Sequence, residues 1–363
     1  MQTNSKLSDV SVLRSFAVFS VVLNHAFNPF MAYGEGMIQT PLSPYYMSVF
    51  ANFWGFRMPL YIFISGYLFS YLFNKKGKYT SFWGFTRNKF ERLIIPYIIF
   101  SVLIALTYNQ FKLEYFKNFI DGYEHLWFIL MLFESFIIAR LLACIKNVNQ
   151  HFWFQAIILI ISFIISLAFR FKVTYFLGIN FLVNYFVWFW FGYIVLLNKE
   201  KLFRLLKYKY VITFIIVWVT LCILIELFCP KHSWGYSNSF GYDSVKYLSY
   251  FSIVIGIFLL INKKIEQGFH APQWVENLNQ CSYGIYIFHC WILFYFFKPS
   301  CPVYSQIQEL ATAHYIIFPA IAFVFLFLIS LFITKLLLRF RVGRFLLGNS
   351  PSAKPQHTTP KYP

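Results

Sequence analysis

Two ionisable residues, Arg14 and His25, lie within one apolar stretch near the start of the chain, from Val10 to Phe30. An ionisable residue inside a membrane-spanning helix is costly to bury and marks a functional site by default. The two residues are eleven positions apart, so on a helix they share one face and lie about 16 Å apart along the axis. This helix would therefore offer a cation near one membrane surface and a titratable imidazole near mid-depth.

The chemistry that suits this pair is proton transfer beside a negatively charged ligand. An imidazole titrates near neutral pH and can take a proton from a hydroxyl group. Asn24 lies about 100° round the same helix, close enough to orient a reactant. Each residue also has a structural alternative, because a single Arg at a helix end commonly anchors the helix at the membrane surface and a single buried His commonly serves packing.

A basic run precedes the third apolar stretch and contains Arg87, Lys89 and Arg92. Clustered cations at a membrane surface usually mark the cytoplasmic side. They are also what a polyphosphate ligand needs, because guanidinium and ammonium groups bind phosphate through charge-assisted hydrogen bonds. The run therefore predicts either a topological anchor or a phosphate-binding element.

Two other stretches carry ionisable residues near their predicted outer ends. Arg57 opens the segment FRMPLYIFISGYLF, as an interfacial anchor or a buried cation, and the Ser-Gly pair of this segment is typical of close helix packing. His125 opens the segment HLWFILMLFE, in which Trp127 suits the membrane interface and Glu134 is a buried acid that needs a partner or a proton.

A second mid-depth histidine, His289, lies in the segment SYGIYIFHCW, where Tyr286 shares its helical face. A buried His on a separate helix is harder to attribute to packing alone. Asn24, Tyr286 or His289 would each be able to donate a hydrogen bond to a developing oxyanion. The sequence does not choose between these donors.

The elements that must position these residues follow from composition. Of the 363 residues, 59% are hydrophobic, 23% aromatic and only 12% charged, which excludes a soluble globular domain. Apolar runs of spanning length recur along the chain, so we expect an all-α polytopic membrane protein. The first run lacks a small-residue cleavage site, so no cleavable signal peptide is expected. Ten spans are predicted, at about 10–32, 48–73, 93–108, 125–144, 153–169, 176–197, 211–229, 245–262, 281–297 and 314–338.

Charge placement predicts the orientation of the bundle. Most of the 31 Lys and Arg residues fall in alternate connections, which places those connections and both termini in the cytoplasm. The net charge of +18 is thereby explained without nucleic acid as a partner. Residues 1–345 are predicted to form the membrane domain, and the polar, Pro-rich residues 346–363 a disordered cytoplasmic tail.

The six cysteines do not show the spacing of a zinc site, and no metal is expected. Most of them lie in apolar runs, where cysteine behaves as a small hydrophobic residue. Cys229 and Cys301 are predicted near the same outer surface, which leaves a disulfide between them open.

The chain resembles the integral-membrane acyltransferase family 3, which includes bacterial O-acetyltransferases of surface polysaccharides. That family shows an ordered set of short motifs along its chain, and each has a counterpart here. The counterparts are Arg14 and His25, separated by ten residues; the Phe-rich LYIFISGYLF; Lys89 and Arg92 before Pro96; Trp127-Phe128; and Tyr283, Gly284, Tyr286 and His289. The sequence departs from the family at Ser15, where Gly is usual, and at Lys89, where a second Arg is common.

The resemblance implies a bundle of about ten helices in the bacterial cytoplasmic membrane that moves an acyl group, usually acetyl, to a sugar hydroxyl of the cell envelope. The donor would be cytoplasmic acetyl-CoA or another acyl-CoA, as a substrate rather than a permanently bound cofactor. His25 would be the catalytic base, with Asn24 beside it. Arg14, Lys89 and Arg92 would bind the acyl-CoA. From its place in the basic run, Arg87 is a further candidate for acyl-CoA binding. The candidates for contact with the acceptor or the oxyanion, taken from their own places in the sequence, are Arg57, Trp127, Glu134, Tyr286 and His289. Whether the chain forms a homo-oligomer is left open.

A transporter or flippase for a lipid-linked sugar is the main alternative, because substrate-conducting bundles also carry buried ionisable residues. Many transporters contain repeated halves with matched broken helices, and the sequence shows no such pairing. A membrane sensor for a small ligand is a third alternative. Consumption of a cytoplasmic thioester would distinguish the enzyme from both.

Overall fold

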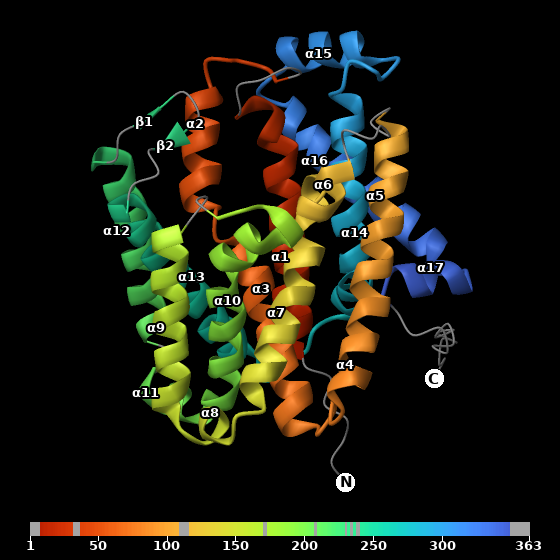
Figure 1. Ribbon diagram of the computed structural model, residues 1–363. Helices are drawn as coiled ribbons and strands as arrows, with labels where there is room; N and C mark the ends of the chain where they lie inside the picture. The colour runs from red at the N-terminus through yellow and green to blue at the C-terminus, as the bar shows by residue number, and fades with distance from the viewer. Residues whose placement is uncertain are drawn as a thin grey trace, which may run out of the picture.

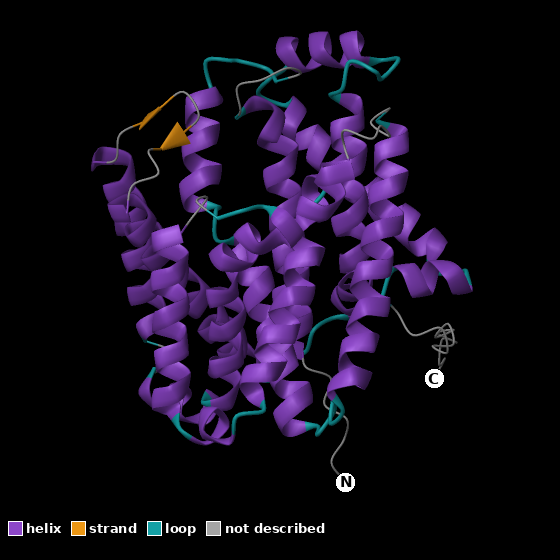
Figure 2. Cartoon of the chain, viewed as in Figure 1, coloured by secondary structure: helices purple, strands orange, loops and turns teal. Residues whose placement is uncertain are grey.

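The computed structural model describes residues 8–31, 37–108, 116–169, 173–206, 209–228, 231–232, 235–236 and 240–348. These residues are almost entirely helical, and one small antiparallel hairpin pairs β1 (Lys231–His232) with β2 (Gly235–Tyr236) (Figure 2). The all-helical class predicted from composition is therefore confirmed.

The long helices run alongside one another as a bundle (Figure 1). They are α1 (Ser8–Phe27), α3 (Arg57–Ser70), α5 (Ile95–Thr107), α7 (Trp127–Ala143), α9 (Phe152–Phe169), α10 (Ile179–Leu197), α12 (Tyr210–Phe228), α13 (Phe240–Glu266), α14 (Gln273–Phe296) and α16 (Phe318–Leu337). The shorter helices are α2 (Ser43–Ser48), α4 (Phe82–Lys89), α6 (Phe116–Asp121), α8 (Lys146–Gln150), α11 (Lys199–Leu205), α15 (Tyr304–Ala313) and α17 (Arg341–Leu346).

Eight helical segments within the described residues are long and apolar enough to cross a membrane. They correspond to eight of the ten predicted spans. The other two predicted spans form α3 and α14. Helix α3 has only 14 residues, and α14 begins with the polar sequence QWVENLNQ, so neither is a typical lipid-facing span. The protein is thus a multi-pass helical membrane protein.

Three predicted starts differ from the structure. The predicted ninth span, 281–297, begins too late, because α14 already starts at Gln273. The predicted second span, 48–73, begins too early, because Val49–Phe53 is a separate π-helical turn and α3 starts only at Arg57. The predicted third span, 93–108, was left open to extend back through Arg92. That extension is confirmed and goes further, because α4, the π-helical turn Phe90–Ile94 and α5 continue from one another over Phe82–Thr107. This extension makes the basic run part of a helix rather than a loop.

Helix α1 lies inside the bundle and packs against α3, α13, α14 and α16. Its small and β-branched residues Ala17, Val18, Val21 and Val22 are fully buried. Small side chains let neighbouring helices approach closely, which is the main source of helix association in a membrane. The first helix of the sequence is therefore surrounded by helices from the middle and the end of the chain.

Helices α3 and α10 cross in close contact at two glycines. A Cβ atom added to Gly66 would lie 1.9 Å from the backbone oxygen of Phe189, and one added to Gly192 would lie 2.0 Å from that of Phe63. Only glycine permits backbones to approach this closely. The interpretation of the Ser-Gly pair as a packing feature is confirmed for Gly66.

A polar network joins the first turn of α1 to two other helices. The Lys199 ammonium lies 3.1 Å from a carboxylate oxygen of Asp9 and 2.9 Å from the Tyr67 hydroxyl, which itself donates to Asp9 at 2.9 Å. Asp9 is buried. A buried charge is tolerated where it is paired and hydrogen-bonded, so this network holds one end of α1 in place.

Three helices that carry predicted cytoplasmic cations, α4, α8 and α11, lie at one end of the bundle, whereas α2 and α15 lie at the opposite end (Figure 1). This segregation is what the charge pattern predicts, although which end faces the cytoplasm stays a prediction. Cys229 and residues 349–363 lie outside the described residues, so the disulfide that the sequence left open and most of the predicted tail are untested.

Candidate active site

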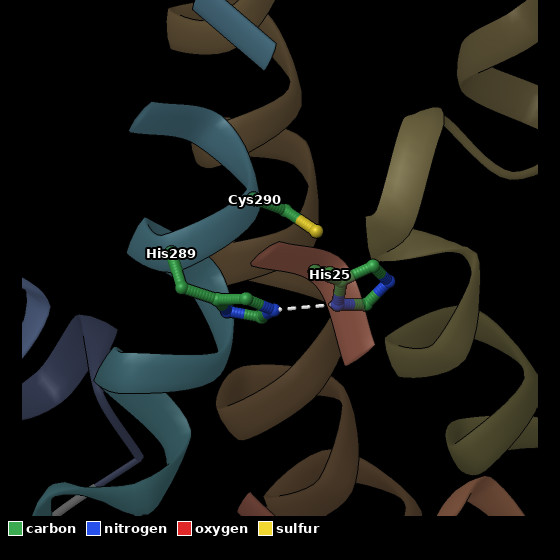
Figure 3. Close-up of side chains that lie close together, drawn as sticks. All are labelled: His25, His289 and Cys290. Carbon is green, nitrogen blue, oxygen red and sulfur yellow. Dashed lines mark hydrogen bonds between the residues drawn. The ribbon is translucent and has the colours of Figure 1, made fainter. Parts of the chain in front are cut away.

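The two mid-depth histidines meet inside the bundle. His25 of α1 and His289 of α14 place Nδ1 and Nε2, respectively, 2.8 Å apart (Figure 3). His289 is completely buried, and its Nδ1 lies 2.8 Å from the backbone oxygen of Ile285, one turn earlier in α14. The sequence placed both residues at mid-depth on different helices, and the fold brings their rings into direct contact.

The register between α1 and α14 explains this contact. Near the other end of the helix pair, Ser11 donates to a carboxylate oxygen of Glu276 at 3.2 Å and accepts from the Asn279 amide at 3.1 Å. Ser15 donates to the backbone oxygen of Val275 at 3.2 Å. Side-chain hydrogen bonds between helices are directional, so these three bonds fix how the helices slide and rotate against each other.

A third imidazole, from His125, lies beside this pair. Its ring centroid is 6.1 Å from that of His289, and its Nε2 lies 2.9 Å from the backbone oxygen of Ile287 in α14. The Nδ1 atom of His125 is buried and has no hydrogen-bond partner among the described residues. The sequence placed His125 only at the start of a span, and nothing in one sequence shows that the 3₁₀ turn Glu124–Leu126 folds against α14.

Cys290 also faces the imidazole pair (Figure 3). Its sulfur and one nitrogen of each of the two histidines lie within 4.8 Å of one another, as the ligands of a metal ion would. Two nitrogens on one tetrahedral zinc ion would be about 3.3 Å apart, given Zn–N bonds of about 2.0–2.1 Å. The observed 2.8 Å separation is shorter and fits a hydrogen bond between the rings better than shared coordination.

A cavity of about 340 Å³ lies nearer the basic end of α1, and it is lined by three of the predicted cations. These are Arg14, Lys89 and Arg92, which the fold brings together from α1 and from the helix that contains the basic run. The Lys89 ammonium also lies 3.5 Å from the centroid of the Phe136 ring, a cation–π contact. The described residues that line this cavity include no carboxylate, so they suit an anionic ligand.

Polar groups of α14 line another wall of the cavity. They include Ser282 and Tyr283. The Tyr283 hydroxyl is buried and has no hydrogen-bond partner within the described part of the chain. A buried hydroxyl without a partner is costly, and a bound ligand would satisfy it.

Three aromatic rings separate the cavity from the histidines. Tyr61 and Phe128 line the cavity, and their ring centroids lie 6.4 Å and 5.1 Å from that of Tyr286. The Tyr286 ring is 5.9 Å from His289 and 5.8 Å from His125, and its hydroxyl donates to the backbone oxygen of His125. The cavity and the imidazoles are therefore neighbours across one aromatic layer.

Arg57 is a cation close to the histidines. Its Nη1 makes long contacts to the backbone oxygens of Trp54 at 3.3 Å and Phe50 at 3.5 Å, and its Nε is buried without a partner among the described residues. The guanidinium lies near enough to His25 and Cys290 for its charge to act on both. This placement favours a buried cation over the interfacial anchor that the sequence also allowed.

Other predicted site residues lie elsewhere. The Arg87 side chain is 83% exposed and pairs with Glu91 at 2.8 Å, outside the cavity. Trp127 stacks on Phe181, with ring centroids 4.5 Å apart, and does not line the cavity. Glu134 does not line the cavity, and its Oε2 is buried without a partner in the described residues. Asn24 is buried on α1 and makes no side-chain hydrogen bond to the histidines.

A cation-lined cavity and a group of buried imidazoles thus lie close together inside a helical membrane bundle. The chain matches a family model described as an acyltransferase domain over residues 7–339. The protein thus belongs to acyltransferase family 3, as the motifs indicated, and it is an acyltransferase of the membrane. No curated protein and no solved structure matches the chain.

Proposed function

We propose that the protein is an O-acyltransferase of the bacterial cytoplasmic membrane that moves an acyl group, most simply acetyl, from cytoplasmic acyl-CoA to a hydroxyl of a cell-envelope sugar or polysaccharide precursor. The observation that carries this proposal is the adjacency of two sites. A cavity lined by Arg14, Lys89 and Arg92 lies one aromatic layer from the imidazoles of His25 and His289. One site suits the donor's phosphates and the other suits proton transfer.

The cavity supports CoA as the donor. CoA carries several phosphate groups at one end and its thioester at the end of a flexible pantetheine arm. Phosphates held by Arg14, Lys89 and Arg92 would leave that arm to pass Tyr61 and Phe128. His25 lies about 16 Å further along α1 than Arg14, so a long, flexible arm is what the spacing of the two sites requires.

In the proposed reaction, His25 takes the proton of the acceptor hydroxyl as its oxygen attacks the thioester carbonyl. The tetrahedral intermediate places a negative charge on the former carbonyl oxygen. This intermediate collapses by breaking the C–S bond, and the departing CoA thiolate takes the proton from His25. The acyl ester and free CoA are the products, and His25 returns to its neutral state.

Donors near the imidazoles would stabilise the oxyanion. Arg57 is the strongest candidate, because it is charged and its Nε lacks a partner among the described residues. Tyr286 is weaker, because its hydroxyl already donates to the backbone of His125. Asn24, Trp127 and Glu134 keep their proposed roles in orienting or contacting the acceptor, without a contact that sets one above the others.

The test is an assay of purified protein in lipid nanodiscs with radiolabelled acetyl-CoA and an extract of lipid-linked sugars. The expected result is release of CoA thiol together with a labelled product that mild base hydrolyses. The His25→Gln variant should lose both signals, and the exposed-site variant His270→Gln should keep them. Full activity in His25→Gln would overturn the assignment of the base, and thioester-independent movement of sugar across the membrane would favour the transporter alternative.

A further inference from the structure

The hydrogen bonds around the imidazole pair determine where the protons lie. The backbone oxygen of Ile285 can only accept a hydrogen bond, so the 2.8 Å contact with His289 Nδ1 requires a proton on that nitrogen. A neutral imidazole carries only one N–H group. The Nε2 atom of His289 is therefore a bare acceptor when the ring is neutral.

The proton between the two imidazole rings lies on His25. Its Nδ1 lies 2.8 Å from His289 Nε2, so one of these two nitrogens must carry the proton between them. The single N–H group of neutral His289 donates to the backbone oxygen of Ile285, so the donor between the two rings is Nδ1 of His25. The remaining nitrogen of His25, Nε2, is then without a proton and has its lone pair available.

We propose that His289 is a positioning residue that holds His25 in the tautomer with a protonated Nδ1 and a bare Nε2, which makes Nε2 the atom that accepts the substrate proton. The second half of this statement rests on the proposed function, whereas the tautomer itself does not. A histidine that orients a catalytic histidine takes the place that a carboxylate holds in hydrolytic triads.

The burial of the pair explains why an imidazole suits this place. A carboxylate at position 289 would bring a full negative charge into a fully buried site, at a high cost in desolvation. A neutral imidazole supplies the same acceptor without that charge. It also keeps its N–H satisfied by the helix backbone at Ile285, so no polar group of His289 is left unpaired.

This arrangement leaves His289 without a free donor. Its Nδ1–H is bonded to Ile285 and its Nε2 accepts from His25. The neutral residue therefore does not donate to an oxyanion, and the role suggested for it by its place in the sequence changes from donor to orienting acceptor. When His25 takes the substrate proton at Nε2, its Nδ1–H bond to His289 persists and disperses part of the new positive charge.

The direct test measures the tautomer in the full-length protein, in nanodiscs, with histidine ring nitrogens labelled with ¹⁵N. Solid-state NMR separates protonated from bare ring nitrogens, and the signals missing from His25→Gln identify His25. We expect a protonated Nδ1 and a bare Nε2 at neutral pH. A bare Nδ1 and a protonated Nε2 would overturn the proposal.

Variants of the two nearby histidines make the readout specific. In His289→Leu, the signals of His25 should shift toward the other tautomer or a mixture. In His125→Leu, which removes another buried imidazole 6.1 Å from His289, the tautomer of His25 should not change. Loss of the tautomer in both variants would mean that general packing, rather than the His289 bond, holds it.

The kinetics of acyl transfer provide a second test. A purely structural role of His289 does not predict that kcat depends on whether the side chain at position 289 reaches His25. In His289→Gln, the side-chain oxygen can reach the position of Nε2 and accept from His25. In His289→Asn, the amide can still bond to Ile285 but is too short to reach His25. We expect kcat to fall by about 10-fold in the Gln variant and by about 10²–10⁴-fold in the Asn variant, with the KM for acetyl-CoA unchanged in both.

The outcomes separate the two proposals. Equal kcat values in the Gln and Asn variants would refute the positioning role, even if both are lower than in the wild type. A wild type that shows the expected tautomer but transfers no acyl group would refute the proposed function alone. A monodisperse elution profile for each variant in detergent is the requirement for including it, and the NMR assignment on the wild type does not depend on any variant folding.

Discussion

The helices around the imidazoles are more buried and more polar than the helices at the periphery of the bundle. The spanning part of α1 is 61% buried and carries Arg14 and His25, whereas those of α12 and α16 are more apolar and only 17% buried. Exposed Ile216 and Phe332 are typical of the peripheral helices. In a membrane, apolar side chains face the lipid. Polar side chains lie inside the bundle, where groups of other helices form hydrogen bonds with them.

The largest expected effect comes from filling the closest contact in the interior. Gly66→Val should cost more than about 3 kcal/mol of stability, because the new side chain would meet the backbone of α10 rather than a movable side chain. The yield of monodisperse protein and its resistance to thermal unfolding measure this. The matched change Ile161→Val, at a half-exposed position of α9, should alter neither. Equal tolerance at both positions would break the contrast between interior and periphery.

The next effect acts on chemistry rather than on folding. His25→Gln should lower kcat by at least about 10²-fold, because general base catalysis typically contributes about 10²–10⁴-fold. The protein should elute as the wild type does, since glutamine is polar and close to histidine in size. Steady-state release of CoA thiol is the measurement. A retained kcat would show that the polar interior is structural and that the base lies elsewhere.

A smaller effect concerns binding at the cation-lined cavity. Lys89→Gln and Arg14→Gln should each raise the KM for acetyl-CoA by about 10-fold, because a hydrogen bond to a charged group contributes about 1.5–3 kcal/mol. Titration of the rate with acetyl-CoA and with its dephospho analogue would show whether either residue binds the phosphate that the analogue lacks.

The control for this prediction is Arg87→Gln. Its guanidinium is exposed and paired with Glu91, so its KM should stay within about twofold of the wild type, as expected for a weak surface ion pair. A KM for Arg87→Gln as high as that for Lys89→Gln would mean that the donor binds outside the cavity.

The smallest effect is expected on the lipid-facing surface. Ile216→Leu on α12, at a position that is 59% exposed, should change stability by less than about 0.5 kcal/mol and leave the kinetics unaltered. Thermal unfolding and the thiol-release assay measure both quantities. A clear loss of either would indicate that α12 contacts a second protein chain rather than lipid at this position.

Local geometry explains how far the sequence predicted the fold and the site. Helix length follows from apolar run length, so most predicted spans agree with the helices to within a few residues. Arg14 and His25 share a helix face because eleven residues make about three turns of any helix. The predictions failed where tertiary contacts decide, as at the start of α3, where the chain separates a π-helical turn from the helix proper.

The basic run illustrates what a single sequence leaves undecided. Arg87 and Lys89 are two residues apart and looked equivalent as phosphate ligands. On a helix they point about 200° apart. Only the packing of that helix against α7 shows that Lys89 enters the cavity while Arg87 faces outward. The position of His125 beside His289 was not predicted for a related reason, because its hydrogen bond to Ile287 joins residues 162 positions apart.

The sequence by itself therefore determined the membrane class, the helices and the placement of a cation and an imidazole on one helix face, because each of these follows from composition and helical period. The tertiary structure alone decided that His25 meets His289 across 264 residues, and that three cations face one cavity. A contact between helices depends on their relative register, rotation and packing. These are properties of the whole assembled bundle, and no local pattern in the chain specifies them.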